Sequence, residues 1–539
     1  MSLLAVEHLS IALPPGGDRA HAVEDVSFTL EPGRVLCLVG ESGSGKSVSA
    51  GAIMGLLPQA LRPQSGTIRF EGEDLLAATP ARLRSLRGAR IGMVFQEPMT
   101  VLNPLMRIGD QIGEMLLAHR WAARALGPVK ARIAALLEAV HLPDPGRIAR
   151  AYPHALSGGQ RQRVMIAMAM ALEPSLLIAD EPTTALDVTT QMQILRLLAD
   201  LQRRRGTAVL FITHDFGVVA EIADDVAVMR HGRIVEQGTA RQVLAAPAHP
   251  YTQSLIAAAL HEGAPRIAAA ADAAELLGVE RLCKTYARAG IFTRTRARRA
   301  LDSVSLSLRR GETYGLVGES GSGKSTLARS IVRLVQPEAG AIRLAGVDLR
   351  PLGRAAWKPF RKRVQMVFQD PFASLNPRMR VGEAIAAGPI AHGMARAAAL
   401  ARAADLLALV QLDPAAAQRF PHEFSGGQRQ RIGIARALAL EPELLIADEP
   451  VSALDVSVQA QILALLEDLR VRLGLTMLFI THDLRIAAQI CDRVAVMRNG
   501  AIVEEGVTAQ VFSHPAHAYT AALLDSVPGR NWRQGGAHG

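Results

Sequence analysis

The chain reads Gly40-Glu41-Ser42-Gly43-Ser44-Gly45-Lys46-Ser47 directly after the apolar run Val35–Val39, and a helix-like segment, Val48–Leu57, follows. A buried strand that enters a glycine-rich turn and then a helix is typical of a P-loop, whose backbone N–H groups and positive helix end bind phosphates. In that arrangement Lys46 reaches the β- and γ-phosphates, and the Ser47 hydroxyl ligates Mg²⁺. The stretch therefore predicts binding of a nucleoside triphosphate.

The same eight residues recur from Gly318 to Ser325, again after an apolar run. Gly318 minus Gly40 gives an offset of 278, and Asp448 minus Asp180 gives 268, so the second copy has lost a net ten residues between these points. One repeat of this size indicates a duplicated domain rather than a solenoid. We expect a first domain at 1–262, an Ala-rich linker at 263–276, a second domain at 277–528 and a disordered tail at 529–539.

The length of 539 residues exceeds what one core normally supports, which agrees with two domains. No stretch of about 18 uncharged apolar residues is present, so no membrane-spanning helix is predicted. The segment Met1–Glu7 lacks the charge pattern of a secretory signal. The 3 cysteines are far apart in the sequence, so neither a disulfide framework nor a metal cluster is predicted, and we expect a reducing, cytoplasmic location.

The charge balance is basic, with a formal net charge of +10 and a pI near 10.0. The densest basic run is 294–299, close to Arg288. A solvated loop, a contact with anionic lipid headgroups and a contact with nucleic acid all remain open for this run. Aromatic residues make up only 4% of the chain, which is few for base-stacking surfaces.

The pattern of apolar residues predicts an α/β fold with a parallel sheet. Leu176–Ala179 is a continuous apolar run, as expected for a strand that is covered on both faces. Another strand, Ile91–Phe95, ends at Gln96, and from there to about Arg150 the apolar spacing becomes helical. We therefore expect a helical subdomain inserted before the turn that begins at Ser157.

Two adjacent carboxylates end an apolar strand in each copy, Asp180-Glu181 and Asp448-Glu449. Beside a nucleotide and its Mg²⁺, the aspartate would hold the ion opposite the P-loop serine. The glutamate would then face the γ-phosphate, where a carboxylate can orient and polarise an attacking water.

A histidine ends a further apolar strand in each copy, at His214 and His482, each after Phe-Ile-Thr and before Asp. We expect each histidine to be a donor near the γ-phosphate. The turns Ser157–Gln160 and Ser425–Gln428 each precede a helix-like run and predict a second anion site per domain. Two phosphate-binding ends per domain favour a pair packed head to tail, in which each domain caps the nucleotide of the other.

On these motifs the chain resembles the ATPases of ABC transporters over nearly its whole length. The resemblance implies that the octets are Walker A loops, that Gln96 and Gln369 are Q-loop glutamines and that the Ser-Gly-Gly-Gln turns are signature motifs. It also implies that Ala185-Leu186-Asp187 and Ala453-Leu454-Asp455 are D-loops. Two tandem nucleotide-binding domains would form two composite sites, and both are expected to hydrolyse ATP with Mg²⁺.

The resemblance assigns the following roles by residue. The candidate catalytic residues are Glu181, His214, Glu449 and His482. The candidate nucleotide-binding residues are Gly40, Glu41, Ser42, Gly43, Ser44, Gly45, Lys46, Ser47, Gln96, Ser157, Gly158, Gly159, Gln160, Tyr286, Gly318, Glu319, Ser320, Gly321, Ser322, Gly323, Lys324, Ser325, Thr326, Gln369, Ser425, Gly426, Gly427 and Gln428. The candidate Mg²⁺ ligands are Ser47, Gln96, Asp180, Ser325, Gln369 and Asp448.

A finer resemblance joins the chain to the dipeptide, oligopeptide and nickel importers. It is based on the sequence around Gln96 and Gln369 and on His249-Pro250-Tyr251-Thr252 after the first domain. The second version of that element, around His514–Thr520, reads as degraded. The chain is similar to the fused type found in glutathione and microcin-type peptide importers.

In this family an aromatic side chain near the first strand usually stacks on the adenine. Tyr286, or less favourably Phe292, can serve the second domain. The corresponding stretch of the first domain, 13–23, contains no aromatic residue except His21. The sequence therefore predicts weaker ATP binding at the first P-loop.

We interpret the chain as the ATP-hydrolysing subunit of a peptide importer, peripheral on the cytoplasmic face of the inner membrane. Its partners would be transmembrane permease subunits and, indirectly, a periplasmic or extracellular solute-binding protein, with no nucleic acid. Nickel or another small solute remains open as the cargo, because this subunit would not touch the solute. A soluble tandem ATPase that acts on ribosomes or DNA is the alternative of a different class.

Overall fold

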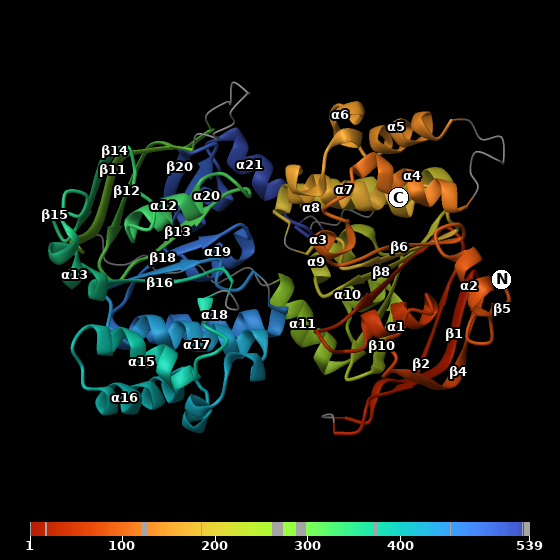
Figure 1. The fold of residues 1–539 in the computed structure, drawn as a ribbon, viewed down its shortest axis with the longest axis horizontal. Coiled ribbons are helices and arrows are strands. Elements are labelled where there is room, and N and C mark those ends of the chain that lie inside the picture. Colours follow the sequence, from red (N-terminus) through yellow and green to blue (C-terminus); the bar gives the residue numbers. More distant parts are fainter. Residues whose placement is uncertain are drawn as a thin grey trace. The chain divides into compact units, whose positions relative to one another are not determined.

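The computed structural model describes residues 2–16, 19–119, 128–184, 186–260, 273–286, 298–370, 374–452, 454–530 and 532. These residues divide into two compact units, the first built mainly from residues 2–260 and the second mainly from residues 273–527. Both units repeat one α/β architecture of two sheets and surrounding helices (Figure 1). The predicted fold of two tandem P-loop domains is confirmed.

The described residues of the first unit form ten strands. They are β1 (Leu4–Ala12), β2 (His21–Leu30), β3 (Val35–Val39), β4 (Arg62–Phe70), β5 (Glu73–Asp74), β6 (Ile91–Val94), β7 (Leu176–Asp180), β8 (Ala208–Thr213), β9 (Asp225–Arg230) and β10 (Arg233–Thr239). Its helices are α1 (Lys46–Ile53), α2 (Pro80–Leu86), α3 (Pro98–Val101), α4 (Ile108–Ala118), α5 (Val129–Ala139), α6 (Pro145–Arg150), α7 (Gly158–Ala169), α8 (Val188–Arg205), α9 (Phe216–Ile222), α10 (Ala240–Ala245) and α11 (Pro250–Leu260).

The larger sheet of this unit has the strand order β10-β9-β3-β8-β7-β6. Strand β3 pairs in parallel with both β8 and β9, and β7 pairs in parallel with β8 and β6. The carboxyl ends of β3, β7 and β8 therefore lie side by side, because parallel neighbours end at the same sheet edge. This edge carries the P-loop, the paired carboxylates and the strand-end histidine.

Strand β3 is buried on both faces, and this fixes the start of the P-loop. Val35, Cys37 and Val39 pack in one core cluster, whereas Leu36 and Leu38 pack in another on the opposite face of the sheet. Because successive side chains of a strand point to opposite faces, both clusters must be apolar. The continuous apolar run in the sequence is the consequence.

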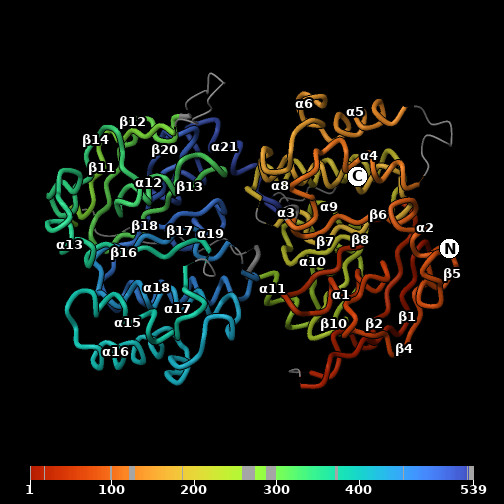
Figure 2. The backbone as a smooth tube through the Cα atoms, in the orientation of Figure 1, coloured from red at the N-terminus to blue at the C-terminus, as the bar shows by residue number. Residues whose placement is uncertain are grey.

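Helices α4, α5 and α6 form the predicted insertion between Gln96 and the turn at Ser157. In Figure 2 they lie together with α7 and apart from the antiparallel sheet β2-β1-β4-β5. One core cluster holds Ile112 and Leu116 of α4 and Leu136 and Leu137 of α5. The same cluster holds Val35, Cys37 and Val39 of β3. The inserted helices therefore share a core with the larger sheet.

The second unit repeats this order. Its strands are β11 (Glu275–Tyr286), β12 (Arg298–Arg309), β13 (Thr313–Val317), β14 (Ala339–Leu344), β15 (Val347–Asp348), β16 (Val364–Val367), β17 (Leu444–Asp448), β18 (Thr476–Thr481), β19 (Arg493–Arg498) and β20 (Ala501–Val507). Its helices are α12 (Lys324–Ile331), α13 (Arg354–Arg363), α15 (Val381–Ala391), α16 (Arg396–Leu409), α17 (Gly426–Leu438), α18 (Val456–Leu473), α19 (Leu484–Ile490), α20 (Thr508–Ser513) and α21 (Ala518–Asp525). The sheets have the orders β12-β11-β14-β15 and β16-β17-β18-β13-β19-β20.

Two element boundaries differ from those expected from the sequence. Helix α1 begins at Lys46, inside the P-loop octet. Strand β11 begins at Glu275, within the segment expected to be a linker, since it pairs with β12 from that residue onward. Residues 261–272 and most of the tail 529–539 lie outside the described residues.

A glycine in β4 lies where two strands come unusually close. Gly66 has a φ of 97°, and a Cβ atom on it would lie 2.6 Å from the carbonyl oxygens of Glu7 and His8. The pairing of β1 with β4 shifts register at the same point, between Glu7 and Ser10. Gly340 in the second unit repeats the arrangement, with a φ of 96° and a nearest backbone oxygen at 2.5 Å.

We expect Gly66→Ala to lower the free energy of unfolding of the first domain by about 3 kcal/mol or more, because a positive φ and a backbone clash add together. Denaturant unfolding followed by circular dichroism measures the change. Gly72→Ala is the matched control, since Gly72 has a φ of 85° and nothing within 4 Å of an added Cβ. It should cost about 1 kcal/mol. Equal losses for the two variants would contradict the close approach of the strands.

Candidate functional site

The P-loop of each domain wraps around a buried lysine. Lys46 is only 4% exposed, and its Nζ donates to the carbonyl oxygens of Gly40 at 2.6 Å and Glu41 at 2.8 Å. Lys324 makes the same pair of bonds to Gly318 at 2.7 Å and Glu319 at 2.9 Å. A buried ammonium needs such acceptors, because its desolvation is otherwise costly. These bonds hold each lysine side chain against the P-loop, and the lysine itself is the first residue of the helix that follows the loop.

Glycines give these loops their shape. Gly40 has a φ of 157°, and a Cβ atom on it would lie 2.2 Å from the carbonyl oxygen of Met229. Gly45 has a φ of 106° and is the N-cap of α1, which favours glycine for its left-handed backbone. Gly318 and Gly323 repeat both features. The glycine pattern of the octet is thus required by backbone geometry and by the approach of a neighbouring strand.

A hydroxyl and a carboxylate face each other across the site, as the sequence predicts. Ser47 Oγ donates to Asp180 Oδ1 at 3.0 Å, and Ser325 Oγ donates to Asp448 Oδ1 at 3.1 Å. Burial raises the pKa of both aspartates above the ordinary value. Two hard oxygen donors next to a phosphate-binding loop suit Mg²⁺, which prefers such ligands and lowers the cost of the buried charge.

The adjacent glutamate is held by the predicted histidine and glutamine. Gln96 Nε2 donates to Glu181 Oε2 at 3.0 Å, and His214 Nδ1 lies 3.4 Å from Glu181 Oε1. Thr184 Oγ1 donates to Glu181 Oε2 at 3.0 Å. The structure therefore brings together Gln96 and Glu181, which are more than 80 positions apart in the sequence.

The second domain repeats the glutamine and histidine contacts. Gln369 Nε2 donates to Glu449 Oε2 at 2.9 Å, and His482 Nδ1 lies 3.2 Å from the same oxygen. Both glutamates have a positive φ, 44° for Glu181 and 48° for Glu449. Non-glycine residues rarely adopt this conformation, and strain of this kind gathers at functional sites. The backbone thus turns each carboxylate away from the end of its strand and toward the glutamine and histidine.

The charge state of these glutamates suits proton transfer. Burial raises the pKa of Glu181 and Glu449, but the contacts with His214 and His482 outweigh it, and the pKa of each carboxyl falls below the ordinary value. For His482, burial lowers the pKa and the bond to Glu449 raises it, with a net rise. Each glutamate is therefore ionised near neutral pH and able to accept a proton.

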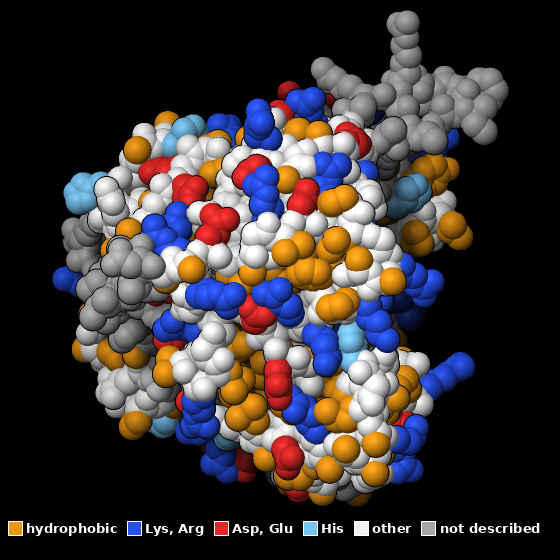
Figure 3. All heavy atoms as spheres, turned by 90° about the vertical axis from the view of Figure 1, so that its left-hand side faces the viewer, with side chains coloured by type: hydrophobic (Ala, Val, Ile, Leu, Met, Phe, Trp, Pro, Cys, Tyr) orange, Lys and Arg blue, Asp and Glu red, His pale blue; other side chains and the backbone are white. Residues whose placement is uncertain are grey.

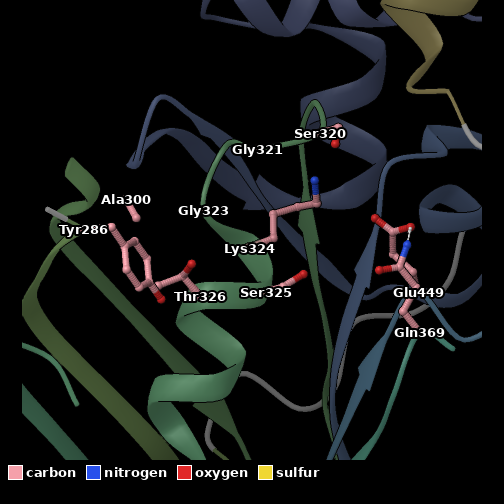
Figure 4. Close-up of a pocket in the computed structure, with 10 residues that line it drawn as sticks. All are labelled: Tyr286, Ala300, Ser320, Gly321, Gly323, Lys324, Ser325, Thr326, Gln369 and Glu449. Atoms are coloured by element: carbon pink, nitrogen blue, oxygen red, sulfur yellow. Dashed lines mark hydrogen bonds between the residues drawn. The ribbon is translucent and has the colours of Figure 1, made fainter. Parts of the chain in front are cut away.

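A cavity of about 280 Å³ opens beside the second P-loop. Figure 4 shows Tyr286 on one side of Lys324 and the pair Gln369 and Glu449 on the other. Thr326 also lines the cavity. The tyrosine ring is 45% exposed, with Lys284 Nζ at 5.5 Å from its centroid. The predicted adenine-binding aromatic thus lies in one cavity with Glu449, a candidate catalytic residue.

The first P-loop has different neighbours on the corresponding side. His8 lies beside Gly66 as Arg281 lies beside Gly340, so these two residues are equivalent. Leu13 comes five residues after His8, and Tyr286 comes five residues after Arg281. Leucine therefore stands where the second domain has its tyrosine. His21 pairs with Gln64 at 3.0 Å, and the Arg19 guanidinium donates to the carbonyl of Gly43 in the P-loop.

The signature turns begin helices α7 and α17. Ser157 Oγ accepts from the backbone N–H of Gln160 at 3.3 Å, and Gln160 Oε1 accepts from the N–H of Ser157 at 3.1 Å, which is a capping box. A Cβ atom on Gly159 would lie 2.6 Å from Thr190 Cγ2 of α8. Close packing of helices therefore also requires this glycine.

The second signature turn has the same construction. Ser425 and Gln428 form the second capping box, and a Cβ atom on Gly427 would lie 2.4 Å from Val458 Cγ1 of α18. That nucleotide binds to Ser157, Gly158, Gly159, Gln160, Ser425, Gly426, Gly427 and Gln428 stays a prediction. Ala185 and Ala453 of the expected D-loops lie outside the described residues.

The sequence did not predict several contacts of the site. Thr184 Oγ1, three residues after Glu181, donates to the Glu181 side chain, whereas Ser452 Oγ, three residues after Glu449, donates to the backbone carbonyl oxygen of Glu449. The hydroxyl of Tyr251 accepts from the backbone N–H of Glu41 at 3.3 Å. The recurrence of a hydroxyl residue three positions after the glutamate is the only local signal that could have indicated the first of these contacts.

Comparisons with known proteins agree with this geometry. The ABC transporter family matches residues 23–184 and 301–452, and the oligopeptide/dipeptide transporter C-terminal region matches residues 235–283 and 503–537. The chain is 49% identical over 526 residues to the peptidoglycan transport ATP-binding protein YejF of Agrobacterium fabrum, covering 97% of this chain and 96% of that protein.

A second relative has a different transported compound in its name. The glutathione import ATP-binding protein GsiA of Escherichia coli O157:H7 is 46% identical over 560 residues, covering 98% of this chain and 90% of that protein. Each domain holds a complete set of the predicted ATP-site residues. These residues agree with the family that the matches indicate. The chain belongs to the ABC transporter ATP-binding proteins and is an ATPase of that family.

Proposed function

We propose that this chain is the ATP-hydrolysing subunit of an importer of peptides across the cytoplasmic membrane. The main evidence that the cargo is a peptide is the match to the oligopeptide/dipeptide transporter region, which follows both ATPase domains. The names of the two relatives refer to peptidoglycan transport and glutathione import, which supports peptide-containing compounds as the cargo. Both domains hold the same catalytic groups, so we infer that both hydrolyse ATP.

In this mechanism the chain's own residues position water and phosphates. Glu181 and Glu449 accept a proton from the attacking water, because each carboxylate is ionised near neutral pH. Lys46 and Lys324 face the negative phosphates from within their loops. The histidine beside each glutamate orients the carboxylate and donates toward the γ-phosphate.

The Mg²⁺ site follows from the same geometry. Ser47 and Asp180 would hold the ion in the first domain, and Ser325 and Asp448 would hold it in the second. When bound, Mg²⁺ neutralises charge on the β- and γ-phosphates. Gln96 and Gln369 each donate one side-chain amide to a glutamate, which leaves the amide oxygen as the atom that could face the ion.

The partners would be permease subunits, with a solute-binding protein acting through them. Among the described residues, no helix is long and apolar enough to cross a membrane, so a permease would supply the passage. Apolar side chains are exposed just after Gln96, with Val101 at 39% and Leu105 at 85% exposed. We propose that this surface docks on a permease loop at the inner face of the membrane.

Nucleic acid is not among the partners that we propose, although the chain is basic. On the face drawn in Figure 3, Lys and Arg side chains are interspersed with acidic and apolar ones. Many arginines are paired with acids, such as Arg299 with Asp302 at 2.8 Å. Residues 294–297 of the basic run lie outside the described residues. A stripe of one sign, which nucleic acid binding needs, is not seen on that face.

The double variant Glu181→Gln and Glu449→Gln tests the function. ATP should still bind, but hydrolysis should fall about 10²- to 10⁴-fold, because a general base is lost at both sites. Uptake of labelled di- to hexapeptides should fall to background in cells that carry the cognate permease. Nucleotide binding, ATP turnover and uptake are measured on the same preparations and cells.

The matched control is Glu173→Gln with Glu441→Gln. These glutamates also differ by 268 in number, and each lies on the surface paired with an arginine, Arg132 or Arg402. The control removes the same charge and should leave turnover and uptake unchanged. If hydrolysis is lost in the catalytic variant while peptide uptake continues, the cargo assignment is wrong. If hydrolysis survives, the glutamates are not the bases.

The two ATP sites should differ in affinity. With Lys46→Ala only the second site binds well, and with Lys324→Ala only the first does. We expect about tenfold weaker ATP binding at the first site, because stacking of a base on an aromatic ring contributes about 1–3 kcal/mol. Titration calorimetry with Mg-ATP on the two full-length variants gives the two constants.

The decisive control is Leu13→Tyr in the Lys324→Ala chain, which places a tyrosine where the second domain has Tyr286. It should raise the affinity of the first site toward that of the second. Equal affinities before this substitution would contradict the predicted difference. An affinity that Leu13→Tyr leaves unchanged would show that the aromatic side chain is not its cause.

A further inference from the structure

The C-terminal helix of each domain reaches the P-loop through a tyrosine. Tyr251 of α11 accepts a hydrogen bond from the backbone N–H of Glu41 at 3.3 Å, and Tyr519 of α21 accepts one from Glu319 at 3.4 Å. Each tyrosine is only 8% exposed. The partners are 210 and 200 residues apart in sequence, so no local turn explains either contact.

A histidine two residues earlier fixes each tyrosine. His249 Nδ1 accepts from the N–H of Tyr251 at 3.1 Å, and His517 Nδ1 accepts from the N–H of Tyr519 at 3.0 Å. The histidine thus caps the helix that carries the tyrosine. The second element, which reads as degraded in the sequence, keeps both functional atoms, and only the intervening Pro250 is replaced, by Ala518.

A glutamate on the adjacent strand holds the same turn. Glu236 of β10 accepts from the N–H groups of Ala248 at 2.7 Å and His249 at 3.1 Å. Glu504 of β20 accepts from the N–H groups of Ala516 and His517 at the same two distances. Two domains with different sequences here have kept one hydrogen-bond pattern, which indicates that it serves a common purpose.

An arginine covers each tyrosine ring. Arg230 lies 4.8 Å from the centroid of Tyr251, and Arg498 lies 4.7 Å from that of Tyr519. Arg230 is next to Met229, whose carbonyl oxygen lies 2.2 Å from the place that a Cβ atom on Gly40 would take. The end of β9 therefore contacts both the tyrosine and the first glycine of the P-loop.

The tyrosine and the P-loop lysine hold the same residue from two sides. In the first domain the N–H of Glu41 is bonded to Tyr251, and its carbonyl oxygen is bonded to Lys46 Nζ at 2.8 Å. Glu319 of the second domain is bonded in the same way by Tyr519 and Lys324. Because the backbone N–H and the carbonyl of one residue are both held, the loop loses less conformational entropy when phosphates bind.

We propose that Tyr251 and Tyr519 are positioning residues that hold each P-loop in its phosphate-binding shape. By this contact the oligopeptide-type C-terminal region acts on ATP binding within its own domain. Burial raises the pKa of both phenols, that of Tyr519 to about 12, so both remain neutral and able to accept the bond at physiological pH. Phenylalanine keeps the ring and removes only the hydroxyl.

The test is steady-state ATP hydrolysis by the full-length chain carrying Tyr251→Phe and Tyr519→Phe, with Mg-ATP as the substrate. Loss of one hydrogen bond per site should raise KM about three- to tenfold. The value of kcat should stay within about twofold, because the catalytic glutamates are untouched. Binding of Mg-ADP should weaken by the same factor as binding of Mg-ATP, because the loop cradles phosphates that both share.

Tyr152→Phe is the matched control. Tyr152 stacks on His154 with ring centroids 5.7 Å apart, and the second domain naturally has Phe420 there, stacked on His422 at 5.9 Å. This control should change neither KM nor the unfolding midpoint. An unchanged KM in the double variant would overturn the proposal. An unchanged KM with a lowered unfolding midpoint would show that the tyrosines only anchor their helices.

Discussion

The buried lysine of each P-loop is the group on which the rest of the structure depends. Lys46 and Lys324 are each 4% exposed, and a charge in such a place is stable only with acceptors arranged around it. Loop carbonyls supply those acceptors on one side. For Lys324, burial lowers the pKa while Glu449 and Asp448 act against this shift. The glycines, the doubly buried strand and the strand-end carboxylates all serve to build this environment.

Duplication offers an internal comparison that a single domain lacks. The side-chain contacts of Glu181 and Glu449 agree within 0.2 Å, with glutamine distances of 3.0 and 2.9 Å and histidine distances of 3.4 and 3.2 Å. The adenine side differs, since Tyr286 of the second cavity has leucine as its counterpart. The two sites therefore share the candidate catalytic groups and differ at the position predicted to contact the adenine.

The sequence was sufficient to predict the parts of the site that lie at the ends of strands. A continuous apolar run such as Leu176–Ala179 locates a buried parallel strand, and topology then brings Asp180, Glu181 and His214 to one edge. It could not reach contacts that depend on three-dimensional packing across long separations. The bond from Glu41 to Tyr251 is of this kind, and so is the close approach at Gly66, because neither leaves a local periodic pattern.

Trapping with orthovanadate tests the central claim, that both domains complete the catalytic step, most directly. The intact chain is incubated with saturating Mg-8-azido-ATP and vanadate, irradiated and digested, and the labelled peptides are assigned to a domain. If both candidate sets of catalytic residues work, label should appear in both domains, in peptides near Leu13 and near Tyr286, where the adenine is expected to lie. Label confined to one domain at saturating nucleotide would contradict the account.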